Sequence, residues 1–165
     1  KSGDIDLFGN IDTDVLKINN ALSQTGSITQ LKDSRHIHVY LVNGIKVDIV
    51  NYTYPWLEDL IQEEGIRLAK YEDIAAMKIA AITGRRTKKD FVDLYFLLEK
   101  MPLSRILQFY LDKYSDGSLF MVLKSLLYFE DADLDNMPDM LIPVQWRLVK
   151  KAIVNAQKEY IKKNG

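Results

Sequence analysis

The dipeptide Asn43-Gly44 is the feature that most restricts how this chain of 165 residues can fold. It separates two apolar, β-prone runs, His36–Val42 and Ile45–Asn51. Asn-Gly between such runs is the pair that best fits a two-residue type I′ turn, because both turn positions need positive φ. We therefore predict an antiparallel hairpin over residues 36–51.

Composition narrows the class of protein. Hydrophobic residues make up 47% and charged residues 27%, with 22 Lys+Arg against 23 Asp+Glu, which is typical of a globular chain with a sizeable core. Disordered and collagen-like chains are excluded. The longest apolar run, Ile74–Ile82, is too short for a membrane span and contains Lys78. The absence of Cys excludes disulfides and thiolate chemistry, so we expect a cytoplasmic protein without a membrane partner.

The pattern before residue 70 predicts a small mixed sheet. The alternating run Gly3–Phe8 is typical of a half-buried strand, and Asp12 is the expected N-cap of a helix through about Leu22. Two further short strands are expected at Ile28–Leu31 and within Ile61–Ala69.

The pattern after residue 70 predicts helices, and the start of each rests on local signals. We expect them at Glu72–Thr83, from Thr87 in a capping box to about Lys100, at Leu103–Tyr114, from Gly117 to about Tyr128, and from Pro143 onward. The fold class is therefore α+β. We expect a core at residues 1–70 and, packed on it, a helical region at residues 71–165.

Asp4 and Asp6 give the first chemical signal. Alternate residues of a strand point the same way, so these two carboxylates share a face, roughly 6–7 Å apart at the backbone. Two such charges repel unless a cation lies between them, and Mg²⁺ prefers carboxylate oxygens. A solvated edge strand explains the pair about as well.

Asp48 strengthens the interpretation of a metal site. In the predicted hairpin it lies opposite Val39 and shares a face with apolar residues, where an uncompensated carboxylate is costly. If its strand neighbours the one with Asp4 and Asp6, three acids converge as in sites that hold two metal ions for phosphoryl transfer. A register slip that moves Asp48 into water is the alternative.

Lys78 stands in a helix that is otherwise apolar from Ile74 to Ile82. Its ammonium either extends to the rim of the buried surface or binds an anion such as a triphosphate. A cluster of four bases follows this helix: Arg85, Arg86, Lys88 and Lys89.

The base cluster could hold phosphates of a nucleotide or of RNA. Alternatively it is a solvated turn, in which Asp90 is the capping acid and Lys89 pairs with Asp93. By spacing alone the second interpretation is favoured. His36 and His38 share a strand face, but without further soft ligands they are expected to be structural or surface residues.

Several ordered motifs resemble one family. Lys1–Phe8 resembles the Ser-x-Asp-hydrophobic-Asp-hydrophobic-Phe signature of the AbiEii/AbiGii-type nucleotidyltransferase toxins, a branch of the polymerase-β-like nucleotidyltransferase superfamily. Ile45–Val50 is similar to the strand that carries that family's third carboxylate. The other similar segments are Glu72–Arg85, Lys88–Leu94, Tyr128–Ala132 and Pro143–Lys150.

The resemblance implies a nucleotidyltransferase fold in which Asp4, Asp6 and Asp48 bind Mg²⁺, with a two-ion site expected. It also implies that Lys78 contacts the nucleotide phosphates and that Asp90 supports the catalytic site. The remaining nucleotide-binding candidates are Ser2, Arg85, Lys89 and Asp93. Family members carry a Gly-Gly or Gly-Ser turn before the Asp-x-Asp strand. Either that segment lies upstream of Lys1, as we expect, or this chain is impaired in binding NTP.

The function implied is Mg²⁺-dependent transfer of NMP from an NTP to an acceptor hydroxyl, with tRNA as the expected acceptor. Such a protein is the toxin of a toxin–antitoxin pair that causes abortive infection, and its antitoxin is the expected protein partner. Asp48 is the candidate to activate the hydroxyl. Two alternatives stay open: nucleotidylation of a protein or a small molecule such as an antibiotic, and a noncatalytic relative that binds nucleotide or RNA.

Overall fold

The computed structural model describes residues 3–11 and 14–164. By its internal contacts the chain divides into two units, Lys1–Tyr54 and Pro55–Gly165. No helix within the described ranges is both long enough and apolar enough to cross a membrane.

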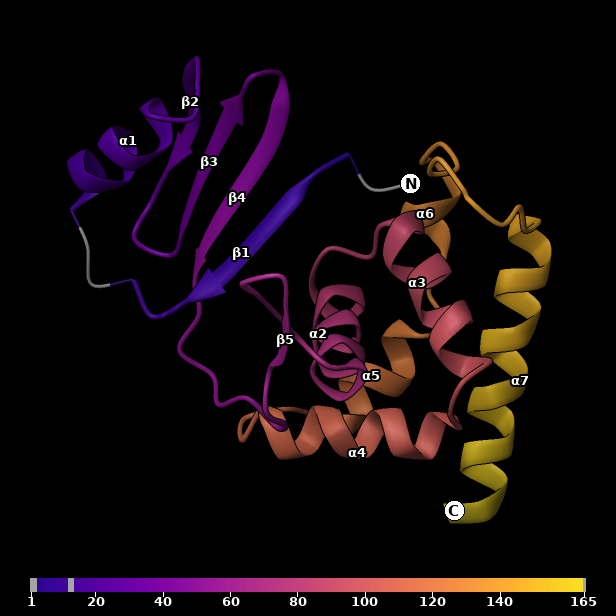
Figure 1. The fold of residues 1–165 in the computed structure, drawn as a ribbon. Coiled ribbons are helices and arrows are strands. Elements are labelled where there is room, and N and C mark those ends of the chain that lie inside the picture. The colour runs from indigo at the N-terminus through magenta and orange to yellow at the C-terminus, as the bar shows by residue number, and fades with distance from the viewer. Residues whose placement is uncertain (1–2, 12–13, 165) are drawn as a thin grey trace. The chain divides into compact units, whose positions relative to one another are not determined.

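The first unit is a four-stranded mixed sheet with one helix. Its strands are β1 (Ile5–Gly9), β2 (Ile28–Asp33), β3 (Ile37–Val42) and β4 (Ile45–Asn51), and its helix is α1 (Val15–Ser23). The spatial order is β1-β4-β3-β2, in which β1 runs parallel to β4 and the other pairs are antiparallel (Figure 1). The small mixed sheet predicted from the sequence is confirmed.

The predicted hairpin turn is present. Val42 pairs with Ile45, and Asn43 and Gly44 have φ of 49° and 82°, the positive values that a type I′ turn requires. The Asn43 side chain also holds the preceding turn, because its oxygen accepts the Ser27 amide at 3.0 Å. At Gly26, φ is 147° and a Cβ would lie 2.1 Å from that same oxygen, so only glycine fits there.

Helix α1 begins after Asp14, whose carboxylate accepts the Leu16 amide at 3.0 Å. The predicted cap, Asp12, lies outside the described residues. Strand β2 continues two residues beyond the predicted Leu31, through an irregularity in pairing between Gln30 and Lys32. The buried side chains of this unit are Ile18, His38, Val39, Tyr40 and Val47.

The second unit opens with a small hairpin, β5 (Ile61–Glu63) and β6 (Ile66–Leu68). The predicted strand ending at Leu68 is β6, but the prediction missed β5 and the turn between them, where Glu64 and Gly65 adopt φ of 49° and 80°. Glu-Gly is a weaker turn signal than Asn-Gly, which is why the sequence pattern did not reveal it.

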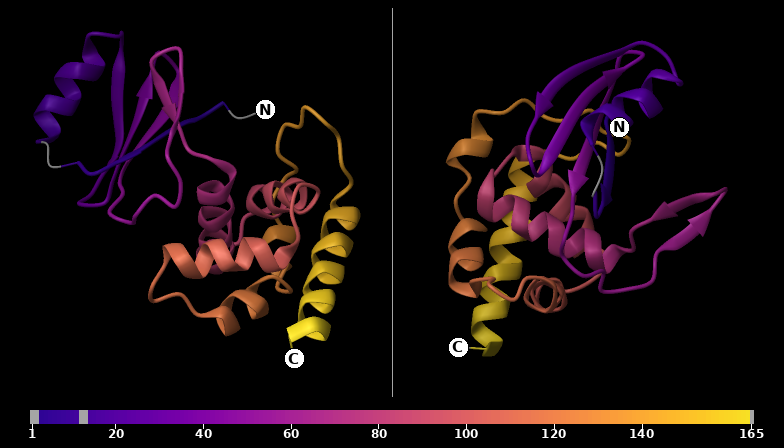
Figure 2. Two further views of the ribbon diagram at one scale, coloured as in Figure 1. Left: turned by 60° about the horizontal axis from the view of Figure 1, so that its bottom comes forward. Right: turned by 90° about the vertical axis from the view of Figure 1, so that its left-hand side faces the viewer.

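Six helices described in the second unit carry its core. They are α2 (Tyr71–Gly84), α3 (Lys88–Leu98), α4 (Leu103–Lys113), α5 (Leu119–Ser125), α6 (Glu130–Asp133) and α7 (Trp146–Asn164). Helix α4 crosses α2, and α7 runs beside α3 (Figure 2). Residues buried where they meet include Ala75, Ile79, Phe91, Leu94, Ile106, Leu107, Val149 and Ile153.

Two helix boundaries differ from prediction by three residues, more than the others do. Helix α7 begins at Trp146 and not at Pro143, since the Trp146 ring packs against Phe91 and Phe129 and its Nε1 donates to Asp133 at 2.5 Å. Helix α5 ends at Ser125, and the acidic run beyond it contains the short α6, which periodicity could not predict over four residues.

Candidate active site

The parallel pairing of β1 with β4 brings acids from distant parts of the first unit to one face. Asp6 lies level with Asp48, as Ile5 does with Val47. Asp4 lies immediately before the first residue of β1, and the register of the two strands begins after it, at Ile5. Val39 is opposite Asp48 on β3, as the hairpin register predicted.

Asp48 is the most enclosed of the three carboxylates, with a side chain 16% exposed, whereas Asp4 and Asp6 are exposed. Lys46 Nζ lies 2.7 Å from the Asp48 carboxylate and donates to its Oδ2. Oδ1 is buried and lies 2.7 Å from the same ammonium, so both oxygens of the carboxylate contact Lys46. Sequence reasoning missed Lys46, although its position two residues before Asp48 on one strand signals a shared face.

The same carboxylates are the candidate ligands of a metal ion. Among the residues described, no three acidic or histidine side chains lie close enough together to hold an ion. Lys46 instead neutralises Asp48. The chemistry of the donors nevertheless suits a hard divalent cation, because all three groups are carboxylates, whose oxygens such cations prefer.

Lys78 in the second unit lies between two acids. Its Nζ is 2.6 Å from the Asp93 carboxylate and 3.7 Å from that of Asp90, and its side chain is 23% exposed. The alternative pairing of Asp93 with Lys89 is wrong in this structure, because Asp93 contacts Lys78. An ammonium has three donors, so Lys78 keeps donor capacity for an anion at its exposed side.

Asp90 is fully buried at the start of α3 and accepts a bidentate pair of hydrogen bonds from Arg85 Nε and Nη2, both at 2.8 Å. Burial raises the pKa of this carboxyl, but the hydrogen bonds from Arg85 and Thr87 and the charges of Arg85 and Lys78 outweigh burial and hold the pKa below its usual 3.8. The positive φ of Arg86, 53°, bends the chain between Arg85 and Asp90.

The predicted capping box at Thr87 was half right. Helix α3 does begin immediately after Thr87. The Thr87 hydroxyl, however, donates to the Asp90 carboxylate at 2.6 Å and does not cap an amide of the helix. Asp90 therefore organises the α2–α3 junction from inside.

The four bases of this junction do not form one patch. Arg85 binds Asp90, whereas Arg86 lies 3.6 Å from Asp131 and over the Tyr128 ring. Lys88 is buried, and its ammonium and amide both bind Asp135. Lys89 is half-buried and makes no ion pair within the described ranges.

A pocket of about 270 Å³ adjoins Lys78 between α2 and α3. Its lining is mainly apolar: Tyr71, Ile74, Lys78, Asp93, Phe96, Leu97 and Lys100. Lys100 Nζ lies over the Tyr71 ring, 5.2 Å from its centroid. The pocket combines two cations with aromatic rings, a combination that sequence spacing did not reveal.

Ser2 and the two histidines are the other residues singled out from the sequence. Ser2 lies outside the described residues. His38 is buried with Nδ1 2.6 Å from Asp33, which fits the structural role expected of it. His36 is exposed and precedes β3.

Two crystal structures of Helicobacter pylori proteins share the fold of this chain. One is a candidate nucleotidyltransferase, with a TM-score of 0.52 and 20% identity over 98% of this chain and 79% of that chain. The other is JHP933, with a TM-score of 0.52 and 19% identity over 97% of this chain and 76% of that one. The class of fold is therefore that of a nucleotidyltransferase.

Sequence comparison gives the family. The profile of AbiEii, the nucleotidyl transferase toxin of type IV toxin–antitoxin systems, matches residues 1–161, and the chain belongs to this family. The uncharacterized protein aq_aa25 of Aquifex aeolicus is 34% identical over 152 residues, which cover 90% of this chain and 73% of that protein. Membership makes the chain a nucleotidyltransferase and implies an NTP substrate and an antitoxin partner, as the sequence motifs predicted.

Proposed function

We propose that this chain is a Mg²⁺-dependent nucleotidyltransferase that moves NMP from an NTP to a hydroxyl of tRNA, as a cytoplasmic toxin held in check by its antitoxin. Family membership supports the reaction class. The observation that carries the proposal is the register of β1 and β4, which sets Asp6 level with Asp48, with Asp4 immediately before β1.

Asp4, Asp6 and Asp48 are the residues that would hold Mg²⁺. A bound divalent ion supplies positive charge for the phosphate oxygens and the departing pyrophosphate. Lys46 occupies Asp48 through a 2.7 Å contact, so its ammonium would have to give way to a cation.

Each of these side chains has a role in the proposed reaction. The acceptor oxygen forms a bond to the α-phosphorus, the bond from that phosphorus to pyrophosphate breaks, and the hydroxyl proton passes to the Asp48 carboxylate. Lys78 would bind triphosphate oxygens, with its ammonium oriented by Asp93 and Asp90. Arg85 and Thr87 fix Asp90 and so position Lys78 indirectly.

Labelled NTP tests the reaction when it is incubated with the chain, Mg²⁺, total RNA and a protein extract. Label in tRNA is the expected outcome. Label in protein or in a small molecule would replace the proposed acceptor, and no transfer to any of them would favour a noncatalytic nucleotide-binding relative.

Asp48→Asn tests the site. We expect a loss of transfer of at least about 10²-fold, since the carboxylate serves as base and metal ligand. Binding of Mn²⁺, measured by electron paramagnetic resonance, should weaken in parallel. Asp59→Asn is the matched control, because Asp59 is an exposed acid of the second unit, outside the proposed machinery. Unchanged transfer and Mn²⁺ binding in Asp48→Asn would refute the site.

A further inference from the structure

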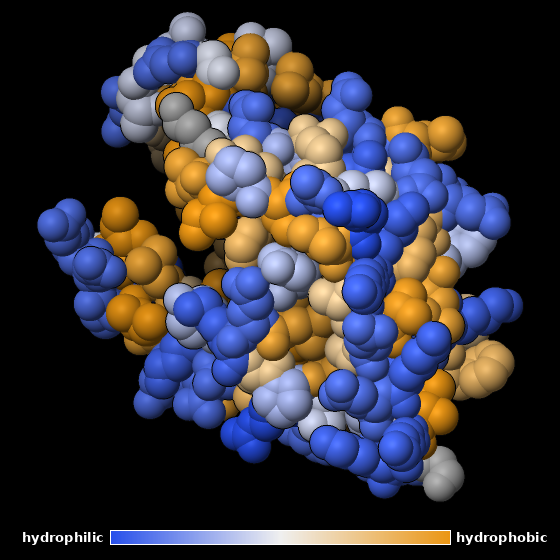
Figure 3. Space-filling model, turned by 90° about the vertical axis from the view of Figure 1, so that its right-hand side faces the viewer, coloured by the Kyte–Doolittle hydropathy of each residue, from blue (hydrophilic) through white to orange (hydrophobic). Residues whose placement is uncertain are grey.

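The outer face of α7 carries a line of cations. At about 100° per residue, positions 147, 151, 158 and 162 fall within about 60° of arc, and they span about 22 Å along the helix. The four residues of this basic stripe are Arg147, Lys151, Lys158 and Lys162, all exposed. Viewed from the side on which α7 lies, the helix shows a row of hydrophilic residues from end to end (Figure 3).

The stripe is not neutralised by the helix itself. Within the described parts of the chain, none of its four cations forms an ion pair, whereas the inward-facing Lys150 lies 2.9 Å from Asp133. The single acid of α7 is Glu159, which lies on the flank of the stripe. An uncompensated line of positive charge on a rigid helix attracts a polyanion.

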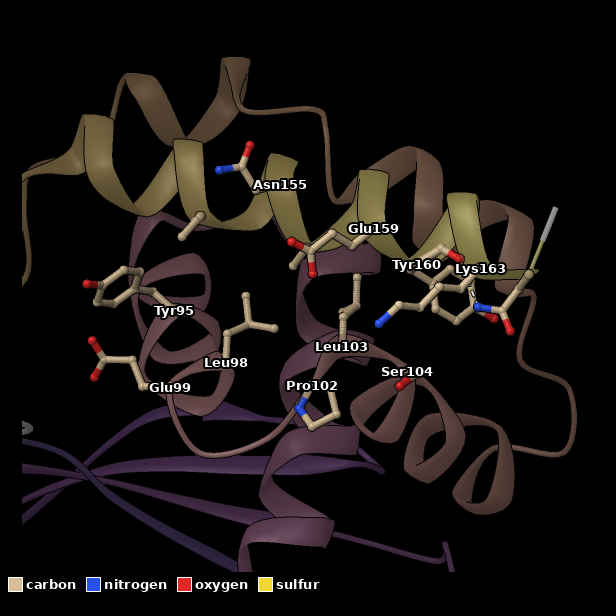
Figure 4. Close-up of a pocket in the computed structure, with 13 residues that line it drawn as sticks. Tyr95, Leu98, Glu99, Pro102, Leu103, Ser104, Asn155, Glu159, Tyr160 and Lys163 are labelled. Carbon is tan, nitrogen blue, oxygen red and sulfur yellow. Dashed lines mark hydrogen bonds between the residues drawn. The ribbon is translucent and has the colours of Figure 1, made fainter.

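A groove of about 300 Å³ runs along that flank, between α7 and the junction of α3 with α4. Its lining combines rings, apolar side chains and hydrogen-bonding groups, among them Tyr95, Leu98, Glu99, Leu103, Ala152, Glu159, Tyr160 and Lys163. Glu159 and Lys163 extend from α7 toward the groove, and Tyr95 and Leu98 of α3 lie across from them with Glu99, which follows α3 (Figure 4). A hydrogen bond to Glu99 fixes the Tyr95 hydroxyl and raises its pKa.

We infer that this face binds single-stranded RNA, with backbone phosphates on the basic stripe and one unstacked base in the groove. Tyrosine rings stack on bases, and carboxylates accept hydrogen bonds from base amino groups. An acidic protein suits the face less well, because its carboxylates would meet Glu99 and Glu159 in the groove. RNA binding at this face does not depend on the proposed function. Only the identification of the bound RNA as the acceptor of the NMP rests on it.

Fluorescence anisotropy with a labelled single-stranded RNA tests the basic stripe in the full chain. The variant carries four substitutions: Arg147→Gln, Lys151→Gln, Lys158→Gln and Lys162→Gln. We expect at least about tenfold weaker binding, and a salt dependence of log K that is shallower by about 0.7 per lost phosphate contact. The control variant has Gln at four other exposed bases, Lys17, Lys32, Arg105 and Lys124, and should bind nearly as the parent does.

Ala152→Phe tests the groove, since it fills the space without changing charge. We expect roughly tenfold weaker binding of the same RNA with an unchanged salt slope, whereas Ala152→Ser should bind as the parent does. Thermal unfolding and circular dichroism confirm that each variant is folded. Parent-like binding by both the stripe variant and Ala152→Phe would overturn the inference.

Other outcomes separate this inference from the proposed function. An equal loss in the control variant, or tighter binding of polyglutamate than of RNA, would also overturn the docking surface. If RNA binds as described but receives no label from NTP, the proposed transfer fails and the docking surface stands. If the stripe variant labels RNA with an unchanged KM, the docking surface fails and the transfer stands.

Discussion

A single carboxylate shows how charge can be kept inside the second unit. Asp90 is fully buried, yet Arg85 and Thr87 give it three hydrogen bonds of 2.8 Å or less. Because charged hydrogen bonds are strong and a buried charge without them is costly, the group stays ionised and orders the α2–α3 junction. The same negative charge attracts the ammonium of Lys78, which lies 3.7 Å away.

Asp90→Asn should therefore destabilise the chain by about 3 kcal/mol at neutral pH. The folded-state pKa is depressed, so the contribution of Asp90 is fully present above the ordinary value of 3.8 and is lost as pH falls through the lower folded value. Urea unfolding at several pH values checks this prediction. The difference in unfolding free energy between Asp90→Asn and the parent should shrink below about pH 4. A difference that stays constant with pH would contradict it.

At the scale of elements, a buried ion pair ties a loop to two helices. Lys113 of α4 and Asp73 of α2 are both buried, with Nζ 2.5 Å from Oδ1. Lys113 also donates to the Pro55 carbonyl at 2.6 Å, and Asp73 accepts the Leu57 amide at 3.1 Å. The beginning of the second unit is thereby fixed to α2 and α4.

Asp73→Asn should cost about 3–5 kcal/mol of unfolding free energy, because it leaves the Lys113 charge buried without its counterion. Urea denaturation followed by tryptophan fluorescence provides the measurement, since Trp56 lies under the Lys113 ammonium at 4.8 Å from the ring centroid. The double variant with Lys113→Met should be less destabilised than Asp73→Asn alone. A loss below about 1 kcal/mol in the single variant would show that water reaches the pair.

Elements fixed by neighbouring residues could be predicted from the sequence. The Asn43-Gly44 turn set the hairpin register, and this register correctly placed Val39 opposite Asp48. The starts of α3 and α4 likewise followed local signals at Thr87 and Pro102.

Contacts between distant residues could not be predicted. Nothing in the spacing of Asp73 and Lys113 signals their pairing, which depends on how α4 crosses α2. The same reason applies to the candidate site. Residue types identified Asp4, Asp6, Asp48 and Lys78, but the Lys46 contact and the pocket beside Lys78 depend on side-chain positions in three dimensions.

At the scale of the whole molecule, the two units differ in how much apolar surface they bury. The helical unit has a continuous core from Ala75 to Ile153. The sheet unit buries only a few side chains, and on its edge strand β1 Ile5 and Leu7 are each 47% exposed. Local stability follows buried apolar contacts, so the units should open with different free energies.

Hydrogen–deuterium exchange of the full chain tests this difference. Amides of α2 and α3 should be at least about tenfold better protected than those of β1 and β2, which corresponds to about 1.4 kcal/mol. Equal protection in the two units would mean that they unfold together. Asp73→Asn should lower amide protection in the helical unit. It should leave unchanged the order of protection among the strands of the sheet.

The parallel pairing of β1 with β4 also affects the order in which parts of the chain fold. Between these strands the chain must complete α1, β2 and β3, so Asp6 meets Asp48 only through a nonlocal closure that is slow compared with hairpin formation. A newly made chain can thus form its β3–β4 hairpin and its helices before Asp6 lies level with Asp48. On the proposed assignment of the site, Asp6 and Asp48 come together late, and a chain whose local elements have already formed would still be inactive until they do.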